Sequence, residues 1–411
     1  MKLRINISHK IIQKSVNLFV VGLFLLPIYI DLMGTLSRVL GFSTKITTYL
    51  YYGILWILLL VSIPKIIRAL TNAVLIGILV VTMFIVGQYL AFPDNTIYIF
   101  PKSLDEVITL SPTTLVTVIP YIFIGLAITD IEGLAEYMHT GSRIGVVLGA
   151  LSYLLAIFFD YDIHYDDMAN AYALCSVICV LITSYQKKDI YFLILGAFSL
   201  ILAGTRGPIL CVIIAVLLRV LLLERTSTRK TFLIIAGVCV IFLILQTDFL
   251  VEILNFVEYG FEMLGVDDLR IVEYFRRDMI ADASGRDGIS NVILEGIAQR
   301  PMLGYGPGGD RIVRNSNSYA HNLVLEMWVS YGVVVGSLII AWMGYWLFKS
   351  IFSKGKALGA ISAALFSCIA VKLLLSSSYL YSKELFVFLG VCIAGCRILK
   401  NNFSQIKRET I

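Results

Sequence analysis

The chain has 411 residues, a formal net charge of +5 and a mean hydropathy of +0.87. Hydrophobic residues make up 58% and charged residues only 15% of it, whereas soluble globular proteins contain about 25% charged residues. This composition excludes a water-soluble enzyme and leaves an integral membrane protein with many spans. The net charge is too small to argue for binding to nucleic acid.

Twelve apolar segments are expected as transmembrane helices, so the fold class is an all-α polytopic membrane protein. They lie at about residues 15–36, 44–63, 72–92, 114–130, 143–160, 168–185, 189–204, 207–223, 231–251, 320–348, 357–377 and 384–398. The seven cysteines all lie within apolar segments, so we expect no disulfide framework.

The orientation follows from the cations that flank these segments, because Lys and Arg accumulate on the cytoplasmic side of a membrane. If the N-terminus is cytoplasmic, most of the 33 Lys and Arg residues fall on inner segments. Most of the others lie in one long outer segment, to which the rule does not apply. We therefore expect both termini to be cytoplasmic.

One connection, residues 252–320, is far longer than an ordinary loop and is expected to fold as a small helical cap on the periplasmic side. Its first part reads as an amphipathic helix along the membrane surface. A second helix is expected to begin after Ser284 and to end before Pro301, and a glycine-rich loop follows. The expected domains are transmembrane helices 1–9 in residues 1–251, the periplasmic cap in 252–320, and helices 10–12 with a cytoplasmic tail in 321–411.

The cap contains seven arginines and no lysine: Arg270, Arg276, Arg277, Arg286, Arg300, Arg311 and Arg314. Guanidinium groups form paired hydrogen bonds with phosphate. Pairing with the eleven acidic residues of the same segment is an equally good interpretation for most of them. Arg286 differs, because it lies in the first turn of the predicted second helix, where free backbone N–H groups already favour an anion. A cation at that position indicates a bound anion.

Two further positions indicate a site on the outer side. Arg206 lies in the turn AGTRGPIL between two spans, and Gly207 and Pro208 favour a ligand site there over a snorkelling interfacial anchor. His321 opens the tenth span, where a helix N-terminus favours the neutral imidazole that a base or hydrogen-bond donor requires, although a structural role is commoner for a lone histidine. Asn322 and Glu326 share one face of that helix.

Metal and nucleotide chemistry have little support. The acidic stretch DYDIHYDDMAN, residues 160–170, fits no standard metal loop and reads as a solvated turn. There is no P-loop, GxSxG, HExxH or paired-cysteine zinc motif.

The motif TRG after one span, SGR leading to P-x-LGYG in the outer segment, and HNxxLE at the next span together resemble the O-antigen ligase and polymerase family of bacterial envelopes. The resemblance covers about residues 165–345. It implies a multi-pass glycosyltransferase of the bacterial inner membrane with a periplasmic active site. The implied donor is a glycan on undecaprenyl diphosphate, and neither a metal nor any other cofactor is implied.

The resemblance places Arg206 and Arg286 on the donor diphosphate and His321 beside the reacting hydroxyl, as a base or an orienting group. The residues expected to bind substrate around them are Asn322, Glu326, Arg300, Asn170 and Arg277. The individual roles of Arg276 and Arg277 stay open.

Polymerisation of O-antigen or related repeat units is the first functional interpretation, because the LGYGPGG loop and the span after HNLVLEMW look more like the polymerases. The alternative is an O-antigen ligase that transfers the glycan to lipid A-core. A lipid-linked oligosaccharide flippase and a non-enzymatic scaffold are further alternatives. The implied partners are the lipid-linked donor and acceptor, the bilayer, a chain-length regulator and a flippase, with no nucleic acid.

Overall fold

The computed structural model describes residues 9–41, 43–69, 72–103, 114–158, 167–203, 206–223, 259, 286–316 and 319–409. Within these residues all regular structure is helical and no strand occurs, in agreement with the all-α prediction. The ninth predicted span, the first part of the cap and the acidic residues 160–166 lie outside the described residues.

The helices that follow one another along the described chain are α1 (His9–Leu40), α2 (Thr44–Ala69), α3 (Asn72–Ala91), η1 (Pro93–Asn95), α4 (Thr96–Ile99), α6 (Leu115–Val118), α7 (Tyr121–Leu126), α8 (Ile131–Phe158), α9 (Asp167–Thr183), η2 (Lys187–Asp189), α10 (Ile190–Ala203), α11 (Arg206–Leu218), η3 (Arg219–Leu223), α15 (Arg286–Gln299), α16 (Gly309–Arg314), α17 (Leu323–Ile351), α18 (Lys356–Leu365), η4 (Phe366–Ala370), α19 (Val371–Leu375), η5 (Tyr379–Tyr381) and α20 (Lys383–Glu409).

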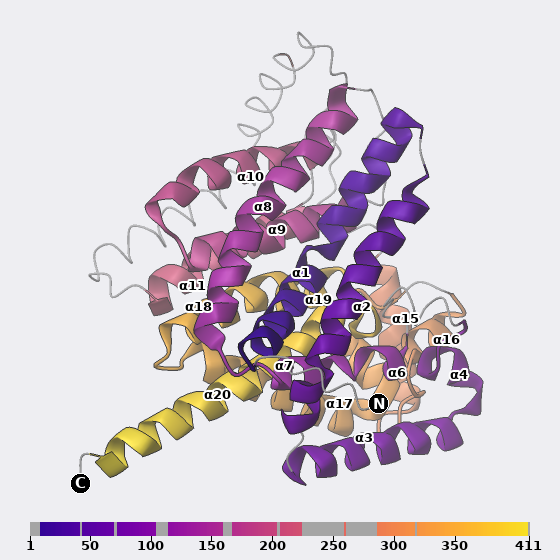
Figure 1. Ribbon diagram of the computed structural model, residues 1–411. Helices are drawn as coiled ribbons and strands as arrows, with labels where there is room; N and C mark the ends of the chain where they lie inside the picture. The colour runs from indigo at the N-terminus through magenta and orange to yellow at the C-terminus, as the bar shows by residue number, and fades with distance from the viewer. Residues whose placement is uncertain are drawn as a thin grey trace, which may run out of the picture.

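The centre of the molecule is one apolar core to which most of the long helices contribute (Figure 1). Helix α1 packs against α2 and α8, and α9 packs against α8, α10, α11 and α18. Helix α3 lies at the periphery and exposes most of its apolar side chains. A separate, smaller cluster joins α15 to the start of α17.

Five helices of the described chain are long and apolar enough to cross a membrane, and a sixth span results if one bent pair is counted as a span. They begin at Lys14, Thr44, Val74, Leu323 and Lys356. The protein is therefore an integral membrane protein. Twelve spans stay a prediction, because several of the remaining apolar helices are shorter than a bilayer requires.

The segment 114–130, which we expected as a single span, is not one continuous helix. It consists of the short helices α6 and α7 with Pro120 between them, and α8 then begins at an angle of 118°. The bend has a local cause, because the Asp130 carboxylate accepts a hydrogen bond from the Gly133 N–H at 2.8 Å and so starts a new helix. Residues 131–142, which we expected as a connection between spans, are consequently helical.

Helix α17 is broken at Gly332, where φ is 78° and ψ is 163°. The break frees the carbonyls of Val329 and Ser330, which accept hydrogen bonds from the N–H groups of Tyr305 and Gly306, both at 2.8 Å. The glycine-rich loop therefore pairs with the broken helix through backbone hydrogen bonds. This pairing fixes the first half of α17, and with it His321, against the described part of the cap.

A polar cluster far from His321 along the chain ties α8 to the turn between α9 and α10. The fully buried Asp189 carboxylate accepts a hydrogen bond from Arg143 Nε at 2.8 Å and pairs with Arg143 Nη2 at 2.7 Å. It also lies 3.3 Å from His139 Nε2. A second hydrogen bond joins His139 Nδ1 and Ser184 Oγ at 2.7 Å. A buried carboxylate needs such partners. The cluster therefore has a structural role, in which it holds α8 against the turn between α9 and α10.

Candidate functional site

His321 lies directly before α17, and its backbone is held on both sides. It has φ 55°, a left-handed conformation that is uncommon for residues with a side chain. On one side the Ala320 N–H donates to Asp310 Oδ2 at 2.8 Å. On the other, Asn322 Oδ1 accepts from the N–H groups of Val324 and Leu325 and caps α17. The structure thus assigns the Asn322 side chain an N-cap contact within the protein.

Behind His321 a buried ionic cluster is centred on Arg311, which is 2% exposed. Its Nη1 lies 2.9 Å from Asp310 Oδ1 and 3.4 Å from Glu326 Oε1. Its Nη2 donates to Ser378 Oγ at 3.1 Å, and the Ser378 hydroxyl donates to Glu326. The Tyr379 N–H donates to the other Glu326 oxygen at 3.2 Å. The Glu326 carboxylate therefore joins the cap to the segment between α19 and α20.

Three tyrosine rings surround the same guanidinium. The Arg311 Cζ lies 5.4 Å from the Tyr98 ring centroid, 5.8 Å from that of Tyr319 and 5.2 Å from that of Tyr381. Burial alone would lower the pKa of Arg311, but the carboxylates of Asp310 and Glu326 outweigh it and raise that pKa above its ordinary value. Arg311 is thus a permanently charged, enclosed group with no open face for a substrate.

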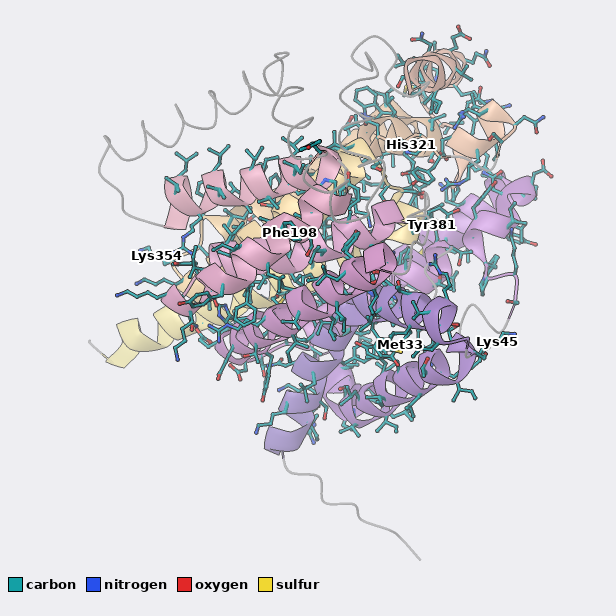
Figure 2. The ribbon with its side chains drawn as sticks, turned by 90° about the horizontal axis from the view of Figure 1, so that it is seen from above. Met33, Lys45, Phe198, His321, Lys354 and Tyr381 are labelled. Carbon is teal, nitrogen blue, oxygen red and sulfur yellow. The ribbon has the colours of Figure 1, made fainter. Side chains whose placement is uncertain are left out.

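Tyr319 connects this cluster to His321. Its ring lies 4.2 Å from the His321 ring, centroid to centroid, at an interplanar angle of 40°. The Tyr319 hydroxyl donates to the Ser376 carbonyl at 3.0 Å, and the Tyr319 backbone carbonyl accepts a hydrogen bond from Arg314 Nη1 at 3.3 Å. The imidazole therefore packs at a tilt against a residue that hydrogen bonds hold at both its side chain and its backbone. Figure 2 shows His321 and Tyr381 at one end of the helical assembly and Lys354 at the other.

The TRG turn leads directly into α11, which begins at Arg206. Gly207 packs against Tyr172 of α9 so closely that a Cβ there would lie 2.0 Å from the Tyr172 hydroxyl oxygen. The Pro208 carbonyl accepts a hydrogen bond from the Cys175 thiol at 3.2 Å. The glycine is therefore required for the approach of α9 to the start of α11, and this contact brings Asn170 to the same end of the two helices.

The other predicted residues are placed as follows. The Asn170 Nδ2 donates to Asp31 of α1 at 2.5 Å. Helix α15 begins at Arg286 and ends at Gln299, which confirms the second predicted cap helix. The exposed Arg300 guanidinium lies 4.7 Å from the Tyr305 ring centroid, away from the Arg311 cluster. Arg277 lies outside the described residues.

Sequence reasoning missed three members of the site. Arg311 was one of seven cap arginines without an individual role, and only its position beside Asp310 after the glycine pair distinguished it. Ser378 belongs to the polar triplet 376–378 between two apolar helices, which was a usable signal. The sequence around Tyr98 carries no such signal, because Tyr98 lies more than two hundred residues before Arg311 and contacts it only in the folded protein.

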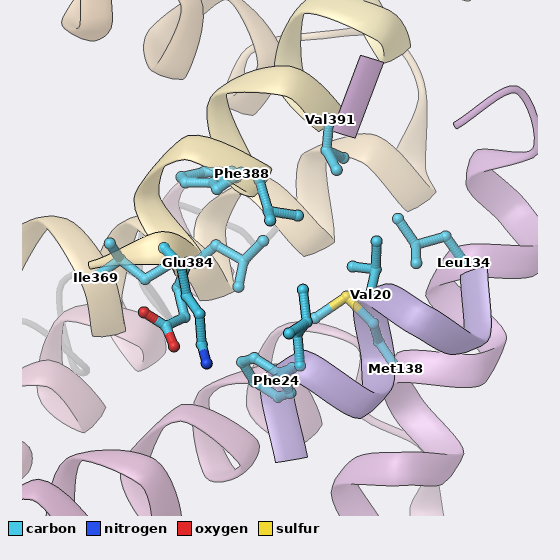
Figure 3. A pocket seen from close by; sticks show the side chains of 12 residues that line it. Val20, Phe24, Leu134, Met138, Ile369, Glu384, Phe388 and Val391 are labelled. Atoms are coloured by element: carbon cyan, nitrogen blue, oxygen red, sulfur yellow. The ribbon is translucent and has the colours of Figure 1, made fainter. Parts of the chain in front are cut away.

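An apolar cavity lies elsewhere, between α1, α8, η4 and α20 (Figure 3). Phe24, Met138, Phe388 and other apolar side chains line it together with Lys383 and Glu384. Its volume is about 30 Å³, which is room for about two water molecules. It is too small for a sugar or a lipid chain and is separate from the His321 site.

Comparison with known proteins agrees with the sequence motifs. Residues 191–340 match the family model of O-antigen ligase. A search of curated proteins found no match. The matched segment contains Arg206, Arg286 and His321, together with Asp310, Arg311 and Glu326 of the buried ionic cluster. This segment of the chain is therefore similar to the O-antigen ligase family, in agreement with the resemblance of its motifs.

Proposed function

We propose that the protein transfers a glycan from undecaprenyl diphosphate to a sugar hydroxyl at the periplasmic face of the bacterial inner membrane. The observation that carries the proposal is the position of His321 at the start of α17, where its ring packs at a tilt against Tyr319, which itself lies against the buried Arg311 cluster. A histidine fixed in this way is suited to orient or deprotonate a hydroxyl group.

Arg206 and Arg286 supply the positive charge that the departing diphosphate requires. Each begins a helix, α11 and α15 respectively, so each combines a guanidinium with the free N–H groups of a helix N-terminus. In the proposed displacement the acceptor oxygen bonds to the anomeric carbon, the bond to the diphosphate breaks, and the arginines stabilise the departing anion. Because the leaving group is already activated, most of the catalysis is positioning and charge stabilisation.

Asn322, Glu326 and Asp310 act in this proposal as positioning residues. Asn322 and Asp310 hold the backbone on either side of His321, and Glu326 holds Arg311 and the segment after α19. Arg300, Asn170 and Arg277 stay proposed substrate contacts.

Within the family we propose polymerisation of surface-polysaccharide repeat units as the specific reaction, on the basis of the LGYGPGG loop and the HNLVLEMW run. Ligation to lipid A-core is the second candidate, because the matching family model is described as O-antigen ligase. The orientation is supported by Figure 2, in which His321 and Tyr381, both expected outside, lie at the end of the assembly opposite to Lys354, which is expected inside.

The test uses purified full-length protein in lipid nanodiscs with a glycan on undecaprenyl diphosphate and an acceptor glycan. We expect a new glycosidic bond and release of undecaprenyl diphosphate. Arg206→Ala and Arg286→Ala should abolish transfer, and Lys at either position should restore it only partly, because Lys keeps the charge without the paired hydrogen bonds. Lys349→Met, at the opposite end of α17, is the matched control. Wild-type protein that translocates the donor without forming a bond would be a flippase instead.

A further inference from the structure

Lys372 is a cation to which the proposed reaction assigns no role, and its contacts connect the TRG motif to the HNxxLE motif. Lys372 is on α19, is half-buried, and directs its Nζ to 5.5 Å from the Tyr172 ring centroid. Tyr172 is 3% exposed and is the same residue that packs against Gly207. Lys372 is therefore one side chain away from the start of α11, where Arg206 lies.

Lys372 is also connected to the His321 side of the site. Its carbonyl accepts a hydrogen bond from the Ser376 N–H at 2.8 Å, so the two residues are one helical turn apart. The Ser376 carbonyl accepts the hydrogen bond from the Tyr319 hydroxyl, and the Tyr319 ring packs against that of His321. A continuous set of contacts thus runs from Gly207 through Tyr172 and Lys372 to Tyr319 and His321.

The charge of Lys372 is uncompensated in the part of the chain that the structure describes. There its ammonium group lies against the Tyr172 ring, and no carboxylate forms an ion pair with it. A ring contact contributes about 0.5–2 kcal/mol, whereas an ammonium group inside an apolar helix of a membrane protein is costly unless it has a partner or a function. Within the described residues, an anion is therefore the partner that Lys372 lacks.

We propose that Lys372, positioned by Tyr172, binds a phosphate group of the lipid diphosphate donor at a point between Arg206 and His321. The inference rests on the proposed function and adds a third cation to its donor site. An ammonium group binds phosphate as a point charge. A phospholipid headgroup has the same chemistry, but the ring below Lys372 belongs to a buried residue, which favours a ligand inside the helical assembly.

The test measures binding of undecaprenyl diphosphate to purified wild-type, Lys372→Met and Lys372→Arg proteins in phosphatidylcholine nanodiscs, with undecaprenol as the phosphate-free probe. Lys349→Met is the matched control, because Lys349 also lies over aromatic rings, 5.0 Å from Tyr345 and 4.8 Å from Trp346. We expect Lys372→Met to weaken diphosphate binding roughly tenfold or more, with undecaprenol binding unchanged, Lys372→Arg close to wild type and Lys349→Met identical to it. Thermal unfolding of each variant separates a loss of binding from a loss of folding.

Binding by Lys372→Met within twofold of wild type overturns the inference. It is also overturned if phosphatidylglycerol stabilises wild type but not Lys372→Met while diphosphate binding is equal in both, because Lys372 then holds a headgroup. The transfer assay is scored separately. Lys372-dependent binding without a new glycosidic bond would contradict the proposed function alone, and transfer with Lys372-independent binding would contradict this inference alone.

Discussion

At the scale of single residues, the site depends on how His321 is held rather than on its chemistry alone. A left-handed φ of 55° is sparsely populated for histidine, and it persists here because Asp310 and Asn322 fix the neighbouring backbone N–H groups. This conformation accompanies the contact between the imidazole and the Tyr319 ring. Strained residues that the surrounding structure fixes are frequent at functional sites.

The two possible roles of His321 can be separated by substitution. Glutamine keeps a hydrogen-bond donor but cannot accept a proton near neutral pH. If His321 is the base, His321→Gln should be as inactive as His321→Ala, with a loss of roughly 10²-fold or more. The measurement is initial rate of transfer in nanodiscs. Appreciable turnover by the glutamine variant, well above that of the alanine variant, would leave only an orienting role.

Arg311 should be more important for stability than any exposed arginine. Its removal leaves Asp310 and Glu326 buried without a cation, and breaking a buried pair in this way costs about 3–5 kcal/mol. We expect Arg311→Met to lower the thermal unfolding midpoint strongly in detergent. Arg311→Met combined with Glu326→Gln should recover part of the loss, because one uncompensated carboxylate is removed. Equal stability of Arg311→Met and wild type would contradict the ionic role.

At the scale of elements, the break in α17 at Gly332 is the feature that joins the cap to the membrane helices. A Cβ at Gly332 would lie 2.1 Å from the Met302 carbonyl oxygen, and the positive φ of 78° disfavours any other residue. The backbone pairing between the glycine-rich loop and α17 therefore requires a glycine at this position.

Gly332→Ala should destabilise the protein by more than about 1 kcal/mol and reduce transfer, since the loop must shift away from α17. Gly344→Ala is the control in the same helix, because its nearest neighbour would be a Phe348 ring carbon 4.0 Å away. That change should be neutral or slightly stabilising. The thermal unfolding midpoints of the two variants test the argument, which fails if they are the same.

The helical elements were largely predictable and the joints between them were not. Apolar runs predicted α1, α2, α3 and α17 to within a few residues at most of their ends, and the Pro301 stop predicted the end of α15. The break at Gly332 lies in a run that is apolar on both sides, so periodicity gives no sign of it. The Arg311 cluster joins residues 67 positions apart, a pairing that no local pattern encodes. Motif resemblance nominates Arg206, Arg286 and His321, and it gives no indication of the residues that hold His321 in place.

At the scale of the whole molecule, the orientation in the membrane decides which side the site faces. Cysteines introduced at the exposed positions Ser316 and Lys354 report on opposite ends of the assembly. In intact spheroplasts we expect an impermeant thiol reagent to label Ser316→Cys and not Lys354→Cys, with both labelled after lysis. Wild type is the background control, because its described cysteines are buried or half-buried. The reverse labelling would place the site in the cytoplasm.

Polymerase and ligase share a donor and differ in acceptor, so the phenotype of a strain lacking this chain distinguishes them. A polymerase extends another lipid-linked repeat unit, and in its absence a ligase elsewhere in the cell still transfers single units. We therefore expect lipopolysaccharide that bears one repeat unit, resolved as one band above the core on a denaturing gel. Complementation with His321→Ala should not restore the long chains, whereas Lys349→Met should. If the strain instead makes bare core and accumulates long polymer on undecaprenyl diphosphate, the donor is elongated without this protein, and the reaction that it catalyses is ligation.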